Sequence, residues 1–163
     1  MKKTLPFKIL TVLLFVTLSI SIFMGASAAS TKNAPKNIIF MIGDGMGPNQ
    51  VNMAHDSIGK NLNMETMPYK GTSETSNVYG QVTDSAAGGT ALACGIKTAN
   101  SRIGMDSSNQ PVPNIREFFA DMGKKTGLVS TVSITDATPA AFGAHNVSRA
   151  NQTQIAAEYI ERE

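Results

Sequence analysis

Three short segments of the sequence carry carboxylate, hydroxyl and guanidinium groups, the side chains that hold metal ions and anions. They lie at residues 38–48, 82–95 and 134–149. The candidate side chains are those of Asp44, Asp84, Ser85, Asp136, Thr138 and Arg149. Each segment has a chemical interpretation and a purely structural alternative.

Asp44 follows an apolar run at 37–42 and lies between glycines. An acidic residue just after a buried strand lies at the carboxyl edge of a sheet, where open α/β folds bind ligands. Its oxygens suit Mg²⁺ or Zn²⁺. A dinucleotide-binding loop is a competing interpretation, but these glycines lack the Gly-x-Gly-x-x-Gly spacing. A turn with an N-cap aspartate is the structural alternative.

Ser85 precedes a run of small residues that predicts a helix beginning at this serine. The free N–H groups and positive dipole end at such a position attract a phosphate or another anion. A serine hydroxyl needs a base or a metal to become nucleophilic. Because neither histidine has a motif that pairs it with Ser85 and no Gly-x-Ser-x-Gly occurs, a metal-activated serine is favoured over a serine-histidine hydrolase. Asp84 and Ser85 as helix caps are the alternative.

The third segment places Asp136 and Thr138 after another strand-like run, and Pro139 in the first turn of a short helix. Arg149 has a planar guanidinium that can bind two phosphoryl oxygens at once. Thr138 as a capping residue and Arg149 as a solvated surface residue are the structural alternatives. The functional interpretation of Arg149 depends on the other two segments.

The elements that must position these groups alternate between strand and helix. The apolar runs at 37–42 and 127–134 are typical of strands buried in a parallel sheet, and a further strand is expected near 70–74. Helical spacing predicts a helix at 115–122, whose apolar stripe belongs to the core, and another at 151–163. Strand, helix and strand in this order predict a crossover unit and an α/β fold.

Composition excludes several classes of protein. The 14 Lys and Arg residues are scattered and nearly balanced by 12 Asp and Glu, so no nucleic-acid partner is predicted. The single cysteine, Cys94, can form neither an intrachain disulfide nor a cysteine-based zinc site.

Residues 1–28 are predicted to be a secretory signal peptide. Lys2 and Lys3 precede an apolar run at 9–24, and small residues follow it, with cleavage expected after Ala28. A membrane anchor is the alternative for this run. Removing residues 1–28 leaves residues 29–163 with 11 basic and 12 acidic side chains, a net charge of −1. The protein is therefore expected to be secreted, periplasmic or at the cell surface.

Together the three segments resemble the alkaline phosphatase family, in its bacterial form, from about residue 36 to residue 149. The stretch around Asp44 resembles the first metal-binding motif, and the stretch around Ser85 resembles the nucleophile motif. The stretch from Asp136 to Arg149 is similar to the magnesium and phosphate-binding region. The resemblance implies a three-layer α/β sandwich with a mostly parallel central sheet.

The resemblance also implies roles for residues. Asp44 resembles the aspartate that binds magnesium and the second zinc, and Ser85 resembles the nucleophile, which also contacts that zinc. Thr138 matches a magnesium ligand, and Asp136 matches a position that reaches magnesium through water. Asp84 resembles the residue that orients the phosphate-binding arginine.

Arg149 resembles that arginine. His145 matches a histidine for which packing is expected, and His55 is interpreted as a surface residue. The implied cofactors are two zinc ions and one magnesium ion, the implied substrates are phosphate monoesters, and a homodimer is expected from the family. The implied reaction passes through a phosphoserine at Ser85.

One departure from the family pattern is important. The family's zinc histidines, its other zinc aspartates and its magnesium glutamate have no counterpart among these residues. Residues 29–163 therefore resemble the amino-terminal portion of the catalytic domain, and the isolated chain is expected to be inactive. A sulfatase or phosphodiesterase of the same superfamily and a non-catalytic secreted binding protein are the alternatives, although the Cys/Ser-x-Pro-x-Arg context of sulfatases is absent around Ser85.

Overall fold

The computed structural model describes residues 35–161 of a chain that divides into two compact units, Met1–Met41 and Ile42–Glu163. In the first unit, the described residues 35–41 form neither a helix nor a strand. The predicted signal peptide at 1–28 lies outside the described residues. Within residues 35–161, no helix is both long enough and apolar enough to cross a bilayer.

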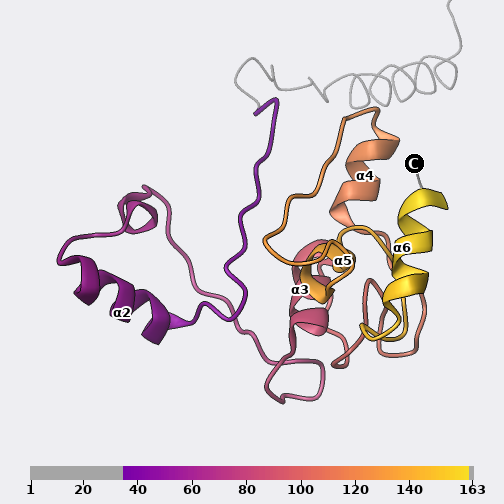
Figure 1. Cartoon of the computed structure of the whole chain (residues 1–163), viewed down its shortest axis with the longest axis horizontal. Coiled ribbons are helices and arrows are strands. Elements are labelled where there is room, and N and C mark those ends of the chain that lie inside the picture. Colours follow the sequence, from indigo (N-terminus) through magenta and orange to yellow (C-terminus); the bar gives the residue numbers. More distant parts are fainter. Residues whose placement is uncertain (1–34, 162–163) are drawn as a thin grey trace, which may run out of the picture. The chain divides into compact units, whose positions relative to one another are not determined.

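The second unit is built mainly from helices and the segments that connect them (Figure 1). Their bounds are α2 (Pro48–Ile58), the 3₁₀ helix η1 (Asn63–Thr66), α3 (Ser85–Cys94), α4 (Ile115–Asp121), α5 (Ala137–Ala141) and α6 (Gln152–Glu161). The helices predicted at 115–122 and 151–163 and the helix predicted to begin at Ser85 are all present. The short helix around Pro139 is present as α5.

Side chains or glycines mark the ends of these helices. Asp84 caps α3 by accepting a hydrogen bond from the N–H of Ala87 at 2.9 Å, and Gly95 ends the helix with a left-handed φ of 72°. Asp136, and not Thr138, is the N-cap of α5. Gly47, and not Asp44, precedes α2. The capping alternatives for Asp44 and Thr138 are therefore not realised.

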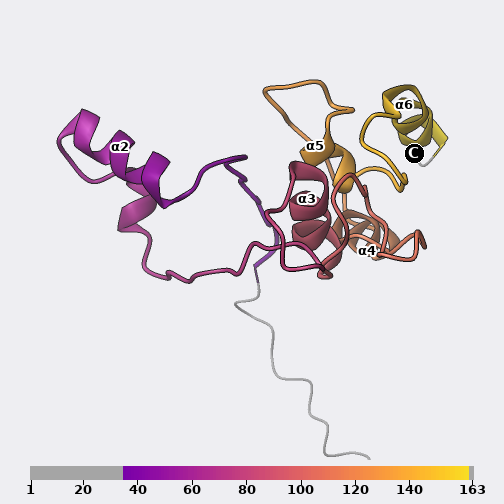
Figure 2. The same cartoon turned by 90° about the horizontal axis from the view of Figure 1, so that it is seen from below.

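The core is made of small side chains because α3 and α5 pack closely together (Figure 2). Ala86 of α3 and Ala137 and Ala140 of α5 are fully buried in one cluster, which Ile155 of α6 completes. Tyr159 of α6 packs against this cluster and donates a hydrogen bond from its Oη to the Ile134 carbonyl at 3.0 Å. Helices α3 and α5 thus meet through alanines, and Ile103 and Ile155 are the largest side chains of the cluster.

The predicted parallel sheet is not confirmed within the described part of the chain. Residues 37–42, 70–74 and 127–134 contain no strand, and isolated bridges join Ile103 to Asn146 and Met105 to Pro111. A strand needs a neighbouring strand to pair its backbone groups, and a lone extended segment is not stable in water. Residues 35–161 supply no such ladder, so these apolar runs remain irregular.

The apolar stripe of α4 also differs from the expectation. Phe118 and Met122 are both 60% exposed, whereas the sequence pattern places them in the core. Phe118 lies edge-on to Phe119, with ring centroids 5.5 Å apart. The periodic spacing therefore predicts the helix correctly but not its burial, because burial depends on what packs against the stripe.

Neighbouring glycines in α3 give a test of the close packing. A Cβ at Gly89 would lie 3.1 Å from the Ala141 Cβ of α5, whereas one at Gly88 would meet only Thr83, at an ordinary 3.6 Å. Gly88→Ala should raise the free energy of unfolding by about 0.5–1 kcal/mol, because alanine is the better helix former. Gly89→Ala should lower it by about 1 kcal/mol or more, since overpacking outweighs that gain. Urea unfolding followed by circular dichroism measures both changes, and equal stabilisation by the two variants would contradict the packing of α3 on α5.

Candidate functional site

Asp44 lies between two hydroxyl groups that come from different helices. Ser85 Oγ, on the first residue of α3, donates a hydrogen bond to Asp44 Oδ1 at 3.0 Å. Thr138 Oγ1, in the first turn of α5, donates to Asp44 Oδ2 at 2.8 Å. These partners are 41 and 94 residues from Asp44 in the sequence. The structure therefore brings three of the predicted site residues together.

Arg149 joins the remaining two carboxylates. Its Nη1 lies 3.5 Å from Asp84 Oδ2, and its Nη2 lies 3.1 Å from Asp136 Oδ1. Both aspartates are helix N-caps, of α3 and α5 respectively. The guanidinium therefore spans the first turns of both helices, and its five N–H donors exceed the two that these ion pairs use.

The arginine and its partners are only partly buried. The side chain of Arg149 is 34% exposed, and those of Asp84 and Asp136 are 25% and 39% exposed. Ion pairs with this much contact to water add little stability, because solvent screens them. The two ion pairs instead orient the guanidinium, which they hold beside the N-caps of α3 and α5.

The oxygen groups around Asp44 fit a hard divalent cation. A carboxylate and two hydroxyl oxygens match the ligand preference of Mg²⁺, which binds oxygen donors and keeps several waters. Zinc binds histidine nitrogen and cysteine sulfur in addition to carboxylate oxygen. Residues 35–161 contain no group of three or more His, Cys, Asp or Glu side chains that could hold a metal. The described residues thus bring three oxygen groups together at Asp44, and they contain no complete cluster of metal ligands.

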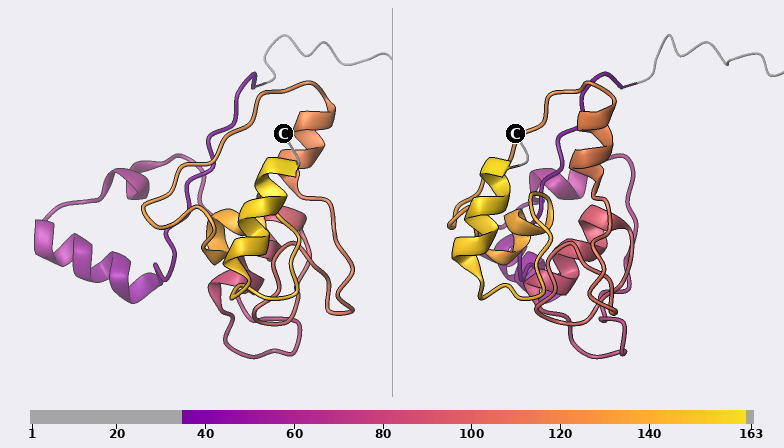
Figure 3. Two further views of the ribbon diagram at one scale, coloured as in Figure 1. Left: turned by 45° about the vertical axis from the view of Figure 1, so that its right-hand side comes forward. Right: turned by 90° about the vertical axis from the view of Figure 1, so that its right-hand side faces the viewer.

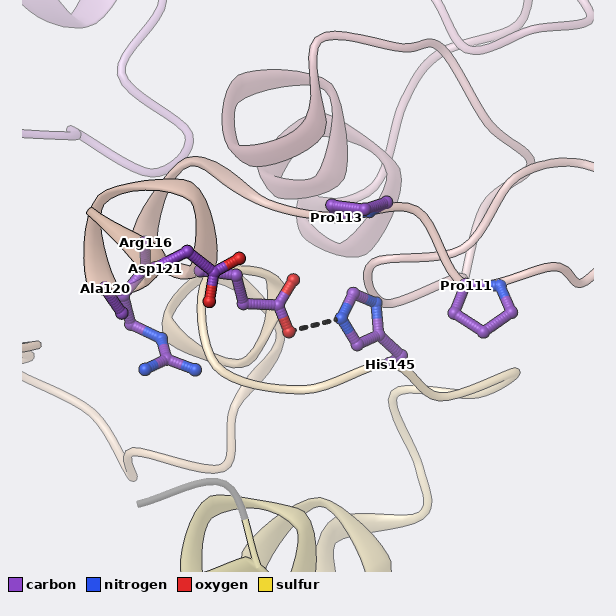
Figure 4. Close-up of a pocket in the computed structure, with 7 residues that line it drawn as sticks. Pro111, Pro113, Arg116, Ala120, Asp121 and His145 are labelled. Carbon is purple, nitrogen blue, oxygen red and sulfur yellow. Dashed lines mark hydrogen bonds and ion pairs between the residues drawn. The ribbon is translucent and has the colours of Figure 1, made fainter. Parts of the chain in front are cut away.

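His145 is held by two partners on different segments. Its ring lies beside Pro111 and Pro113 in a pocket, and Figure 4 marks one of the two contacts with a dashed line. Its Nδ1 lies 2.7 Å from the Gly104 carbonyl oxygen, and its Nε2 lies 2.8 Å from Glu117 Oε1 of α4. Because a carbonyl only accepts, Nδ1 must carry a hydrogen. The ring is buried, so it fastens the chain after α5 to α4 and to the segment around Gly104.

The second histidine, His55, lies on α2 and pairs with η1. Its Nδ1 is 3.1 Å from Glu65 Oε2, and the Leu62 N–H donates to the same oxygen. The pKa of Glu65 is lowered, first by the bond from Leu62 and then by the bond from His55. His55 is thus a partly exposed residue whose partner the sequence did not indicate.

Cys94 lies near the end of α3, away from the cluster around Asp44. Burial and, to a smaller extent, the charge of Glu117 raise the pKa of the Cys94 thiol to about 11. Its Sγ donates a hydrogen bond to the Val112 carbonyl at 3.3 Å. The thiol is therefore protonated at neutral pH, the form that is a poor nucleophile.

Sequence reasoning missed a turn that contacts Asp84. The Ser101 N–H donates to Asp84 Oδ2 at 3.0 Å, and the Asp84 N–H donates to Asn100 Oδ1 at 3.2 Å. An Asn-Ser pair in a polar stretch predicts a turn. It carries no signal for the carboxylate that the turn will meet, because that contact spans 17 residues.

The sequence model of one family, described as alkaline phosphatase, matches residues 35–162. Alkaline phosphatase 4 of Bacillus subtilis is 40% identical over 94% of this chain and 37% of its own length. The repressible alkaline phosphatase of Saccharomyces cerevisiae is 35% identical over 91% of this chain and 27% of its own. The chain therefore spans 37% and 27% of the length of these two relatives.

Solved structures give a similar result. The alkaline phosphatase from the Antarctic bacterium TAB5 is 41% identical over 78% of this chain and 37% of its own, with a TM-score of 0.74. A mutant of that enzyme, solved with Mg bound, is 42% identical and also has a TM-score of 0.74. These neighbours support an alkaline phosphatase-like fold, although the sheet itself is not confirmed within residues 35–161. The chain belongs to the alkaline phosphatase family.

Proposed function

We propose that the chain is the nucleophile-bearing portion of a phosphate monoester hydrolase, with Ser85 as the nucleophile. The observation that carries this proposal is the position of Asp44 between the hydroxyls of Ser85 and Thr138. Membership of the alkaline phosphatase family supports the reaction class. The relatives are longer than this chain, so the complete activity is proposed for a polypeptide that also supplies the remaining metal ligands.

The charges of the site explain why such a reaction would need metal ions. The site has three carboxylates and one guanidinium: Asp84 and Asp136 pair with Arg149, and Asp44 accepts from Ser85. A phosphate monoester is itself anionic, so this excess of negative charge would repel it. Two zinc ions and one magnesium ion, if bound by Asp44 and Thr138 together with ligands from a longer polypeptide, would supply positive charge that offsets the carboxylates and favours the ionised serine.

Each residue of the chain has a role in the proposed reaction. Asp44 would hold magnesium and one zinc, Thr138 would bind magnesium, and Asp136 would reach magnesium through a water. Ser85 Oγ would give its proton to solvent and form a bond to phosphorus while the bond to the alcohol oxygen breaks, and the departing alkoxide would take a proton from water. The phosphoserine would then be hydrolysed by water, which releases phosphate and regenerates the serine.

Arg149 would bind the phosphoryl oxygens during both steps. Its ion pairs with Asp84 and Asp136 support this role, because they leave guanidinium donors for an anion and fix the plane of the group. Phosphate monoesters are the proposed substrates, and a homodimer is proposed from the family. Export after cleavage near Ala28 to the periplasm, the cell surface or the medium is also a proposal, based on residues 1–28.

Metal binding by this chain tests the role of Asp44. Asp44→Asn should weaken the binding of Mg²⁺, or of Mn²⁺ used as a paramagnetic probe, by about tenfold or more, because it removes the charged ligand. Asp56→Asn, an exposed change on α2, is the matched control and should leave the affinity unchanged. Electron paramagnetic resonance of Mn²⁺ measures both affinities. Equal affinities for the two variants would contradict a metal site at Asp44.

The nucleophile can be tested in a chimera. Residues 35–162 of this chain would replace the matching part of Bacillus subtilis alkaline phosphatase 4. In the chimera, Ser85→Ala should lower kcat for an aryl phosphate by at least about a thousandfold, the scale of a lost nucleophile. Ser108→Ala, in an exposed turn, is the control and should keep the activity.

A second set of measurements separates the alternatives. The chimera should form an acid-stable phosphoserine at Ser85, and removal of metals by a chelator should abolish both phosphorylation and turnover. Its rate should be higher for a phosphate monoester than for a phosphate diester or a sulfate ester. Near-normal turnover in Ser85→Ala, or a preference for the sulfate ester, would contradict the proposed function.

A further inference from the structure

Ser101 has a backbone conformation that a serine rarely adopts. Its φ is 72°, in the left-handed region, and Asn109 at 62° is the other non-glycine residue of this kind within residues 35–161. This conformation is unfavourable for a residue with a Cβ atom. Non-glycine residues therefore adopt it where contacts with the surrounding structure stabilise it. The contacts of Ser101 identify what requires it.

The two peptide groups of Ser101 connect the segments that carry Asp84 and Arg149. The Ser101 N–H donates to Asp84 Oδ2 at 3.0 Å, and the Ser101 carbonyl accepts from the Arg149 backbone N–H at 2.9 Å. The guanidinium of Arg149 then returns to the same Asp84 oxygen, at 3.5 Å. Asp84, Ser101 and Arg149 therefore form a closed loop of contacts.

Asn100 fixes the other side of this turn. Its Oδ1 accepts from the Asp84 N–H at 3.2 Å, and its Nδ2 donates to the Val82 carbonyl at 3.1 Å. The buried Asn77 donates from its own Nδ2 to the same Asn100 Oδ1 at 3.1 Å. The backbone just before Ser85 is therefore clamped to the Asn100 side chain.

The segment after Ser101 is fastened to the segment before Arg149 as well. Ile103 and Asn146 exchange both backbone hydrogen bonds, at 2.9 and 2.8 Å. Arg102 Nη1 donates to the Val147 carbonyl at 2.6 Å. Residues 100–103 are thus hydrogen-bonded to Asp84 on one side and to the segment that leads to Arg149 on the other.

We propose that Ser101 is a positioning residue whose left-handed backbone sets the location of the Arg149 guanidinium relative to Asp84 and Ser85. The proposal concerns geometry, and its catalytic meaning rests on the proposed function. It predicts that the conformation of residue 101, and not the serine hydroxyl, is what the site requires. Glycine, which adopts positive φ freely, should preserve the arrangement, and a β-branched residue should destroy it.

The test compares Ser101→Gly and Ser101→Val in the full chain. The readout is the rate at which the arginine reagent phenylglyoxal modifies Arg149, measured by peptide mass spectrometry relative to Arg116 in the same molecule. In Ser101→Val the relative rate should rise about fivefold, the scale expected when partly exposed ion pairs are lost. In Ser101→Gly it should equal that of the unchanged chain.

Asn109→Val is the matched control. It forces the same unfavourable backbone conformation in an exposed turn, so it reproduces the general destabilisation without touching Arg149. Its relative rate for Arg149 should not change. If Ser101→Val fails to fold, Ser101→Ala applies a milder form of the same constraint and should raise the rate in the same direction.

Two results would overturn the proposal: an unchanged Arg149 rate in folded Ser101→Val or Ser101→Ala, or an equal rise in Asn109→Val. The proposed function is tested separately, by adding inorganic phosphate with Mg²⁺ and Zn²⁺ to the unchanged chimera. Phosphate should slow the modification of Arg149. Absence of that protection would count against the anion-binding role of Arg149, whereas the comparison of the Ser101 variants would still decide the positioning role.

Discussion

The close contact between α3 and α5 is the constraint on which the rest of the site depends. Gly89 has no side chain, so the α5 backbone at Thr138 and the methyl group of Ala141 can approach α3. This packing places the N-terminus of each helix beside the other, with an aspartate capping each one. Arg149 can then reach both caps, and Asp44 can reach a hydroxyl from each helix. Two further views of the ribbon show α3 and α5 next to each other (Figure 3).

Much of the local structure could be predicted from the sequence. Helix ends are signalled by residues within one or two turns of them. Examples are Asp84 before a run of small residues, Asn114 before Ile115 and Gly123 after the periodic stripe. The side chains of the candidate site could also be chosen by type and motif. In each case the information lies within a few residues of the element that it specifies.

The strands and the burial of α4 could not be predicted in this way. Val129 and Val132 have the β-branched side chains of a buried strand, yet both are exposed in an irregular segment. A strand is stabilised by partner strands that can be distant in sequence. Its composition therefore indicates a preference for extended structure but does not determine whether a strand forms. The contacts of Ser101 with Asp84 and of His145 with Glu117 are also set by the folded chain, and no local pattern encodes them.

The double use of Asp84 and Asp136 has a consequence for ligand binding. Each carboxylate accepts a hydrogen bond from a backbone N–H of its helix and pairs with the arginine at the same time, so turning either side chain away would release both partners. The dipoles and charges of the site are therefore already aligned when the chain has folded. In the proposed reaction these groups would not have to reorganise around the substrate, because folding has already oriented them.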